Sequence, residues 1–188
     1  MTLRNGGSKK SMKTAEQLRE FNKNRVIDQI CYVTDDIYRT MKYFVEMLDI
    51  GPWNFVLENT PDNTRDVKLD DEEVKEPWRF LIAHAKVGTM TIELIQPDYG
   101  PDPYSEFLKK HGPGLHHIKE SIYDGDDALK ARMDELIARG HKMKYEGKYM
   151  EDIYYYLDVD KELGGFIEFG NSATCSSMPG VIGKYPEE

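Results

Sequence analysis

The sequence has little cysteine, no long apolar segment and no excess of positive charge. Two cysteines, Cys31 and Cys175, are too few for a disulfide framework, so we expect a reducing, cytoplasmic setting. No segment approaches the ~20 apolar residues of a membrane helix, and no hydrophobic run of a secretory signal follows the basic, polar N-terminus. The net charge of −9 disfavours nucleic acid or an anionic membrane as a partner.

What the sequence does contain is one arrangement that occurs twice: a strand, a helix and further strands. In the first half we predict a strand at 26–33, a helix at 37–48 and a hairpin with strands at 78–86 and 90–97. In the second half we predict a strand at 115–123, a helix at 124–140, one or two strands within 142–159, and a last strand at 164–170. A short helix at 102–112 joins the halves.

The 188 residues suffice for two such units. We therefore predict an α+β fold in which two tandem βαβββ modules form curved mixed sheets around a cavity, with a helix on each convex face. The expected boundaries are a flexible N-terminal tail at 1–24, modules at 25–112 and 113–170, a long acidic, mobile loop at 58–77 in the first module, and a C-terminal tail at 171–188. Exposed sheet edges favour a homodimer.

The duplicated strands carry polar residues at matching places. Gln29 and Glu93 lie on the first and last strands of the first half, and His117 and Glu168 lie on those of the second half. Apolar neighbours in the chain need the packed face, so these four side chains must point to the other face. Buried polar groups need partners or a metal. One imidazole, two carboxylates and one amide oxygen suit a single Zn²⁺, Ni²⁺, Co²⁺, Mn²⁺ or Fe²⁺ ion.

The segments "IDQI", "IELIQP", "GLHHI" and "GGFIEFG", in this twofold pattern, resemble the vicinal oxygen chelate superfamily over about 25–170. That superfamily includes glyoxalase I, methylmalonyl-CoA epimerase, extradiol dioxygenases and bleomycin-resistance proteins. The stretch "IELIQPDYGPDPYSEFLKKHGPGLHHI" is most similar to the epimerases. The resemblance implies Gln29, Glu93, His117 and Glu168 as metal ligands. Epimerases usually carry His at the first position and Gln at the second, so this ligand set is instead that of zinc glyoxalase I.

The sequence identifies the acid–base groups less directly than the metal ligands. An epimerase needs such groups on both faces of the substrate carbon, and the family places a carboxylate on the strand before Glu93, where this chain has none. We expect Glu168, with a pKa near neutrality, to move the proton, and Glu93 or Lys119 to serve the opposite face. By alternation Lys119 shares the face of His117. A pKa lowered by burial would make it a proton carrier, while an anion clamp and a solvated lysine are the alternatives.

Several neighbouring residues receive structural interpretations. Strand alternation assigns His116 to the face opposite His117, with no role. His84 is predicted to be structural or to face a loop. Cys31 shares the parity of Gln29 and is expected to line the cavity as a small apolar filler.

These patterns lead to one functional hypothesis and two alternatives. We expect a divalent-metal-dependent isomerase or lyase, epimerase-like or glyoxalase-like, that moves a proton next to the carbonyl or carboxylate group of a small oxygenated substrate that binds the ion. One alternative is a metal-dependent cyclisation, elimination or decarboxylation enzyme of specialised metabolism. The other is a metal-free small-molecule binding or resistance protein.

Overall fold

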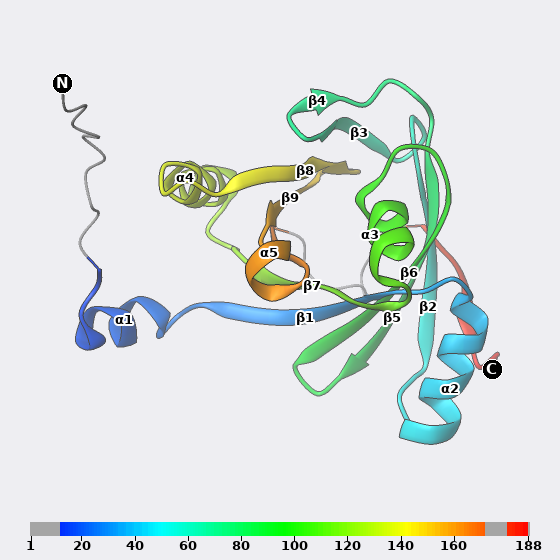
Figure 1. Cartoon of the computed structure of the whole chain (residues 1–188). Helices are drawn as coiled ribbons and strands as arrows, with labels where there is room; N and C mark the ends of the chain where they lie inside the picture. The colour runs from blue at the N-terminus through cyan, green and yellow to red at the C-terminus, as the bar shows by residue number, and fades with distance from the viewer. Residues whose placement is uncertain (1–11, 172–179, 188) are drawn as a thin grey trace.

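The computed structural model describes residues 12–171 and 180–187, which form an eleven-stranded curved sheet with few helices (Figure 1). The helices are α1 (Ala15–Asn22), α2 (Ile37–Leu48), α3 (Pro103–His111), α4 (Asp126–Ile137) and α5 (Asp160–Leu163). The strands are β1 (Val26–Val33), β2 (Trp53–Asn59), β3 (Thr64–Leu69), β4 (Glu72–Glu73), β5 (Arg79–Val87), β6 (Met90–Tyr99), β7 (Gly114–Ser121), β8 (Lys142–Tyr149), β9 (Asp152–Asp158), β10 (Phe166–Gly170) and β11 (Val181–Tyr185).

The strand order reflects an internal duplication. The eight central strands run β2-β5-β6-β1-β7-β10-β9-β8, so each half has the same order seen from the middle. In each half the first strand pairs in parallel with the last, β1 with β6 and β7 with β10. The halves meet where β1 and β7 pair antiparallel. The predicted α+β fold of two βαβββ units around a curved sheet is confirmed.

One helix of each half covers the outer side of its sheet. Asp36 caps α2 by accepting a hydrogen bond from the backbone N–H of Arg39, and the helix buries Ile37 and Met41. In the second half α4 packs Leu129 and Met133 onto its strands. The concave side holds a separate core, rich in aromatic residues, to which α3 also contributes (Figure 1). The inner face is therefore largely filled by side chains.

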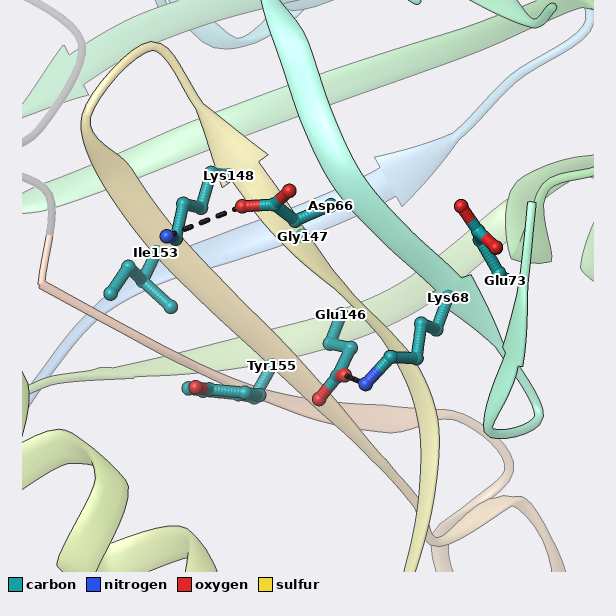
Figure 2. A pocket seen from close by; sticks show the side chains of 8 residues that line it. All are labelled: Asp66, Lys68, Glu73, Glu146, Gly147, Lys148, Ile153 and Tyr155. Atoms are coloured by element: carbon teal, nitrogen blue, oxygen red, sulfur yellow. Dashed lines mark hydrogen bonds and ion pairs between the residues drawn. The ribbon is translucent and has the colours of Figure 1, made fainter. Parts of the chain in front are cut away.

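The prediction of a mobile loop at 58–77 is wrong. Its first two residues belong to β2, and β3 and β4 form a hairpin within it. β3 pairs antiparallel with β8 of the other half, so the insertion crosses from the first module to the second. Ion pairs from Lys68 to Glu146 (2.5 Å) and from Lys148 to Asp66 (3.3 Å) reinforce this pairing beside a surface pocket (Figure 2). The acidic composition of this segment is typical of a loop, and the strand that pairs with β3 is distant in the sequence. The strand was therefore not predicted.

The predicted tails also contain regular structure. Thr14 and Gln17 form a capping box at the start of α1, and β11 adds antiparallel to β2. The outer edges of β2 and β8 are thus covered by β11 and β3, which removes those two edges as a reason for a dimer; the homodimer stays a prediction. Residues 1–11 and 172–179, with Cys175, lie outside the described residues. Within the described ranges, no helix combines the length and apolarity needed to cross a membrane.

Candidate metal centre

The four residues expected to bind a metal lie together on the concave side of the sheet. The ring atom Nε2 of His117 lies 2.9 Å from Oε2 of Glu168, 3.3 Å from Oε2 of Glu93 and 3.5 Å from Nε2 of the Gln29 amide. All four side chains are buried. Side chains this close together can share one ion, and their role as ligands stays a prediction.

Strand register explains why these side chains converge. Alternation turns Ile30, Ile92 and Ile118 to the outer face, which leaves the polar residues beside them on the inner face. Across the paired strands they form two adjacent rows. The first row runs Glu93, Cys31, His117, and the second runs Thr91, Gln29, Lys119, Glu168.

His84 faces this cluster and not a loop. It is directly opposite Glu93 in the pairing of β5 with β6, and its Nε2 lies 2.7 Å from Oε1 of Glu93. Both side chains are buried. Because a ligand carboxylate needs its second oxygen fixed, a neighbour of this kind orients it. His84 therefore positions Glu93.

Glu168 is held from two sides. Its Oε1 lies 3.1 Å from the ammonium of Lys119, and its Oε2 accepts a hydrogen bond of 3.2 Å from the hydroxyl of Tyr156. The Tyr156 hydroxyl in turn accepts one of 3.1 Å from Tyr104 on α3. The tyrosines that the sequence suggested as core residues thus connect α3 to the polar cluster.

The electrostatics of the cluster differ from the prediction. Burial alone would lower the pKa of Lys119, but the charges of Glu168 and Glu93 outweigh it and raise the pKa above its usual value. Lys119 is therefore a fixed cation, and this direction of the pKa argues against the proton-carrier alternative. Burial alone would raise the pKa of Glu168, but Lys119 and His117 outweigh it and hold the pKa below its usual value. The expected pKa near neutrality is not found at Glu168.

A carboxyl group with a strongly raised pKa is Glu58, which the sequence predicts to lie in the loop at 58–77. Burial, followed by the charge of Glu93, raises the pKa of Glu58 to about 8. Its side chain lies on the inner face of β2, where Oε1 accepts a hydrogen bond of 3.2 Å from the Thr64 hydroxyl. The alternation of "WNFVLE", with Val56 and Glu58 on one face, was the signal that could have identified it.

His116 does not point away from His117 as predicted. The pairing of β7 with β1 shifts by one residue at this point, because Cys31 faces His117 whereas Tyr32 faces Leu115. The extra residue, His116, makes a bulge that brings both imidazoles to the same side. Their Nδ1 atoms lie 2.9 Å apart, and both rings contact Tyr156.

A sequence profile of the glyoxalase/bleomycin resistance protein/dioxygenase superfamily matches residues 28–155, which contain three of the four converging residues. The chain belongs to this superfamily. The hypothetical protein BH1468 from Bacillus halodurans C-125 is similar in structure, with a TM-score of 0.58 and 19% identity over 81% of this chain and 97% of that one. Methylmalonyl-CoA epimerase from Mycobacterium tuberculosis is also similar, with a TM-score of 0.54 and 16% identity over 79% and 88% of the two chains.

At these identities the solved structures establish the superfamily fold alone. A curated relative, the uncharacterized protein YqjC of Bacillus subtilis (strain 168), is 32% identical over 80 residues, which are 41% of this chain. The match spans 57% of the length of YqjC.

The residues present in this member of the superfamily fit a divalent ion. Oε2 of Glu93 is buried and accepts no hydrogen bond from the part of the chain that the structure describes. It points to the same nitrogen atom of His117 as Oε2 of Glu168 does. Imidazole, carboxylate and amide groups form an ordinary donor set for Zn²⁺ and its neighbours.

Proposed function

We propose that the protein is a divalent-metal-dependent isomerase or lyase that moves a proton at the carbon next to a carbonyl or carboxylate group of a small oxygenated substrate. Gln29, Glu93, His117 and Glu168 would hold the ion. The observation that carries this proposal is the approach of all three other side chains to within 3.5 Å of Nε2 of His117. When bound, the ion would supply Lewis acidity toward a substrate oxygen.

The chain offers two candidates for the proton-moving group. Glu168 is the residue expected from the sequence, but its lowered pKa and its contacts with His117 and Lys119 favour a ligand role. Glu58 has a pKa of about 8, and a general acid or base works best when its pKa lies near the operating pH. We therefore assign proton transfer to Glu58.

Lys119 has a separate part in this proposal. Its ammonium is buried beside Glu168 and stays charged. A fixed cation at this place stabilises negative charge that develops on a substrate oxygen when the neighbouring carbon loses its proton. Lys119 thus acts as an anion clamp, one of the three alternatives that the sequence left open.

A second candidate function has its own support. His117 and Lys119 already pair with Glu168, and His84 pairs with Glu93, so the cluster can balance its charges without an ion. A metal-free small-molecule binding protein would use the same fold with this cluster as buried structure. Metal analysis of the purified protein separates the two functions, because only the enzyme hypothesis requires a bound ion.

Exchange of substrate hydrogen with heavy water tests the enzyme hypothesis. Candidate acyl thioesters and hemithioacetals are incubated in heavy water with wild type, Glu58→Gln, Glu168→Gln and the exposed control Glu73→Gln, after metal content is measured for each. We expect deuterium incorporation by wild type and by Glu73→Gln. Glu58→Gln should lose it while retaining the metal, and Glu168→Gln should lose the metal as well. Retention of exchange in Glu58→Gln, with loss of exchange in a metal-loaded Glu168→Gln, would return the base to Glu168.

A further inference from the structure

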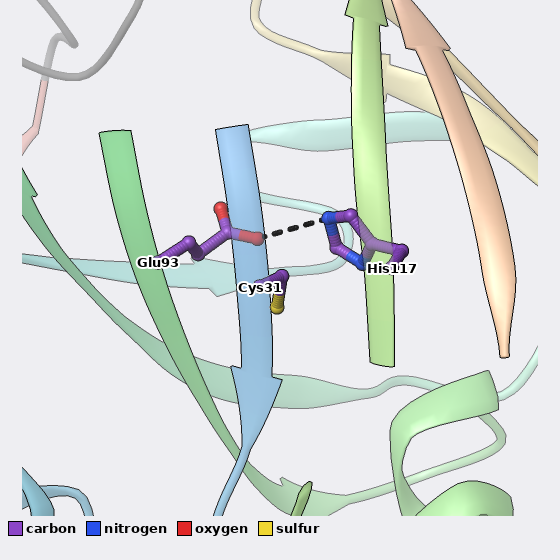
Figure 3. Close-up of side chains that lie close together, drawn as sticks. All are labelled: Cys31, Glu93 and His117. Carbon is purple, nitrogen blue, oxygen red and sulfur yellow. Dashed lines mark ion pairs between the residues drawn. The ribbon is translucent and has the colours of Figure 1, made fainter. Parts of the chain in front are cut away.

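The proposed function makes no use of the thiol at the middle of the metal centre. Cys31 is fully buried, and in the sheet it lies directly between Glu93 on β6 and His117 on β7. Its Sγ, a carboxylate oxygen of Glu93 and a ring nitrogen of His117 all lie within 4.8 Å of one another (Figure 3). Gln29, which lies two residues before Cys31 on the same face of β1, is in the next row, between Thr91 and Lys119.

Building on the proposed function, we propose that Cys31 supplies a thiolate ligand to the divalent ion, so that β1 contributes sulfur to the centre beside the carboxylate of Glu93 and the imidazole of His117. From the sequence, Cys31 is expected to line the cavity as a small apolar filler. The register shows instead that it is the β1 residue directly opposite both of these predicted ligands.

The spacing of the three side chains fits a shared ion. Zinc bonds to sulfur of about 2.3 Å and to nitrogen or oxygen of about 2.0–2.2 Å keep any two ligand atoms within roughly 4.5 Å of each other. The three ligand atoms lie within 4.8 Å of one another, which is close to this range. The buried Oε2 of Glu93 accepts no hydrogen bond from the described residues and lies 3.3 Å from Nε2 of His117, so it is a second atom of the same cluster that faces this place.

Sulfur coordination requires loss of the thiol proton. When the sulfur–metal bond forms, the S–H bond breaks and its proton passes to solvent, which leaves one negative charge on the ligand.

A sulfur ligand also restricts the class of metal. Thiolate favours Zn²⁺ and Co²⁺, whereas Mn²⁺ and Mg²⁺ prefer oxygen ligands. The expected order of affinity is therefore Zn²⁺ and Co²⁺ well above Mn²⁺, and the Cys31→Ser variant should lose a larger part of its affinity for Zn²⁺ than for Mn²⁺.

Cobalt substitution tests the thiolate directly. Metal-free wild type, Cys31→Ser and the matched control Cys175→Ser are loaded with Co²⁺, and bound cobalt is quantified beside the absorption spectrum. We expect the near-ultraviolet thiolate-to-cobalt charge-transfer band in wild type and Cys175→Ser, and its loss in Cys31→Ser with cobalt still bound. Bound cobalt without this band in wild type, or a band retained by Cys31→Ser, would overturn the sulfur ligand and leave the proposed function standing.

Two further results complete the test. No cobalt uptake by wild type contradicts the proposed function together with the sulfur ligand. If Cys31→Ser fails to fold, X-ray absorption of the zinc-loaded wild type decides alone, because a sulfur neighbour at about 2.3 Å is required by the proposal. A shell of nitrogen and oxygen neighbours only would overturn it.

Discussion

Nδ1 of His116 lies 2.9 Å from Nδ1 of His117, although the two residues are consecutive in a strand. A hydrogen bond between them needs one donor and one acceptor. Burial and the neighbouring His117 hold the pKa of His116 well below its usual value, so His116 is neutral and its Nδ1 can accept. His117 then donates from Nδ1, and its Nε2 faces Glu93 and Glu168. The bulge thus orients the nitrogen expected to bind the ion.

This relationship predicts the behaviour of His116→Phe. The ring packs against Tyr104, Phe107 and Phe166, so phenylalanine should keep the packing and most of the stability. Loss of the Nδ1 acceptor should weaken metal binding by about 10- to 100-fold, the usual effect of removing a residue that orients a ligand. Calorimetric titration with Zn²⁺ measures this, and the exposed His141→Phe is the matched control. Unchanged zinc affinity in His116→Phe would show that the contact does not orient His117.

The raised pKa of Glu58 predicts that the stability of the metal-free protein depends on pH. The folded state retains this proton up to about pH 8, whereas the unfolded chain releases it near the ordinary carboxyl pKa of 4.5. Raising the pH between these two values therefore lowers the free energy of unfolding. Glu58→Gln has no such proton, so its stability relative to wild type should increase by up to ~4 kcal/mol from pH 5 to pH 8. Urea unfolding at both pH values measures this, and parallel profiles for the two proteins would contradict the buried acid.

Lys119→Met tests the buried cation. The side chain of Lys119 is only 8% exposed and pairs with Glu168. Removing one partner of a buried pair should destabilise the metal-free protein by about 3 kcal/mol, while the loss of a positive charge should strengthen the binding of a dication. Thermal unfolding is measured with chelator and with added Zn²⁺. The rise in melting temperature on metal addition should therefore be larger for Lys119→Met than for wild type. The exposed Lys142→Met should behave as wild type, and the same result for Lys119→Met would indicate a solvated lysine.

Gly165→Ala should disturb the approach of β10 to β7. A Cβ atom at Gly165 would lie 2.5 Å from the backbone carbonyl oxygen of His116, so the strands would have to separate. Because this pairing sets the distance from His117 to Glu168, we expect a loss of roughly 2 kcal/mol in stability together with weaker metal binding. Gly114→Ala, where a Cβ meets no atom within 4 Å, is the control. Equal stability of the two variants would contradict the close approach.

The fold and the main cluster were accessible from the sequence because both depend on local periodicity. Alternation of polar and apolar residues on the duplicated strands was sufficient to place Gln29 and His117 on one face. The bulge at His116 could not be predicted from the sequence, since it is defined only by the pairing of β7 with β1. Nor could the pairing of β3 with β8, which joins segments remote in the chain. The raised pKa of Lys119 depends on its distance from Glu168, and no sequence pattern reports that distance.

The most direct test of the metal centre is the stoichiometry of Zn²⁺ binding to metal-free wild type and to His117→Ala, measured by calorimetric titration and elemental analysis. Because Nε2 of His117 is the atom at which the other three side chains meet, we predict one ion per chain in wild type and none in the variant, with both proteins folded by circular dichroism. A wild-type protein that binds no divalent ion, or a His117→Ala variant that binds it with wild-type affinity, would contradict the account.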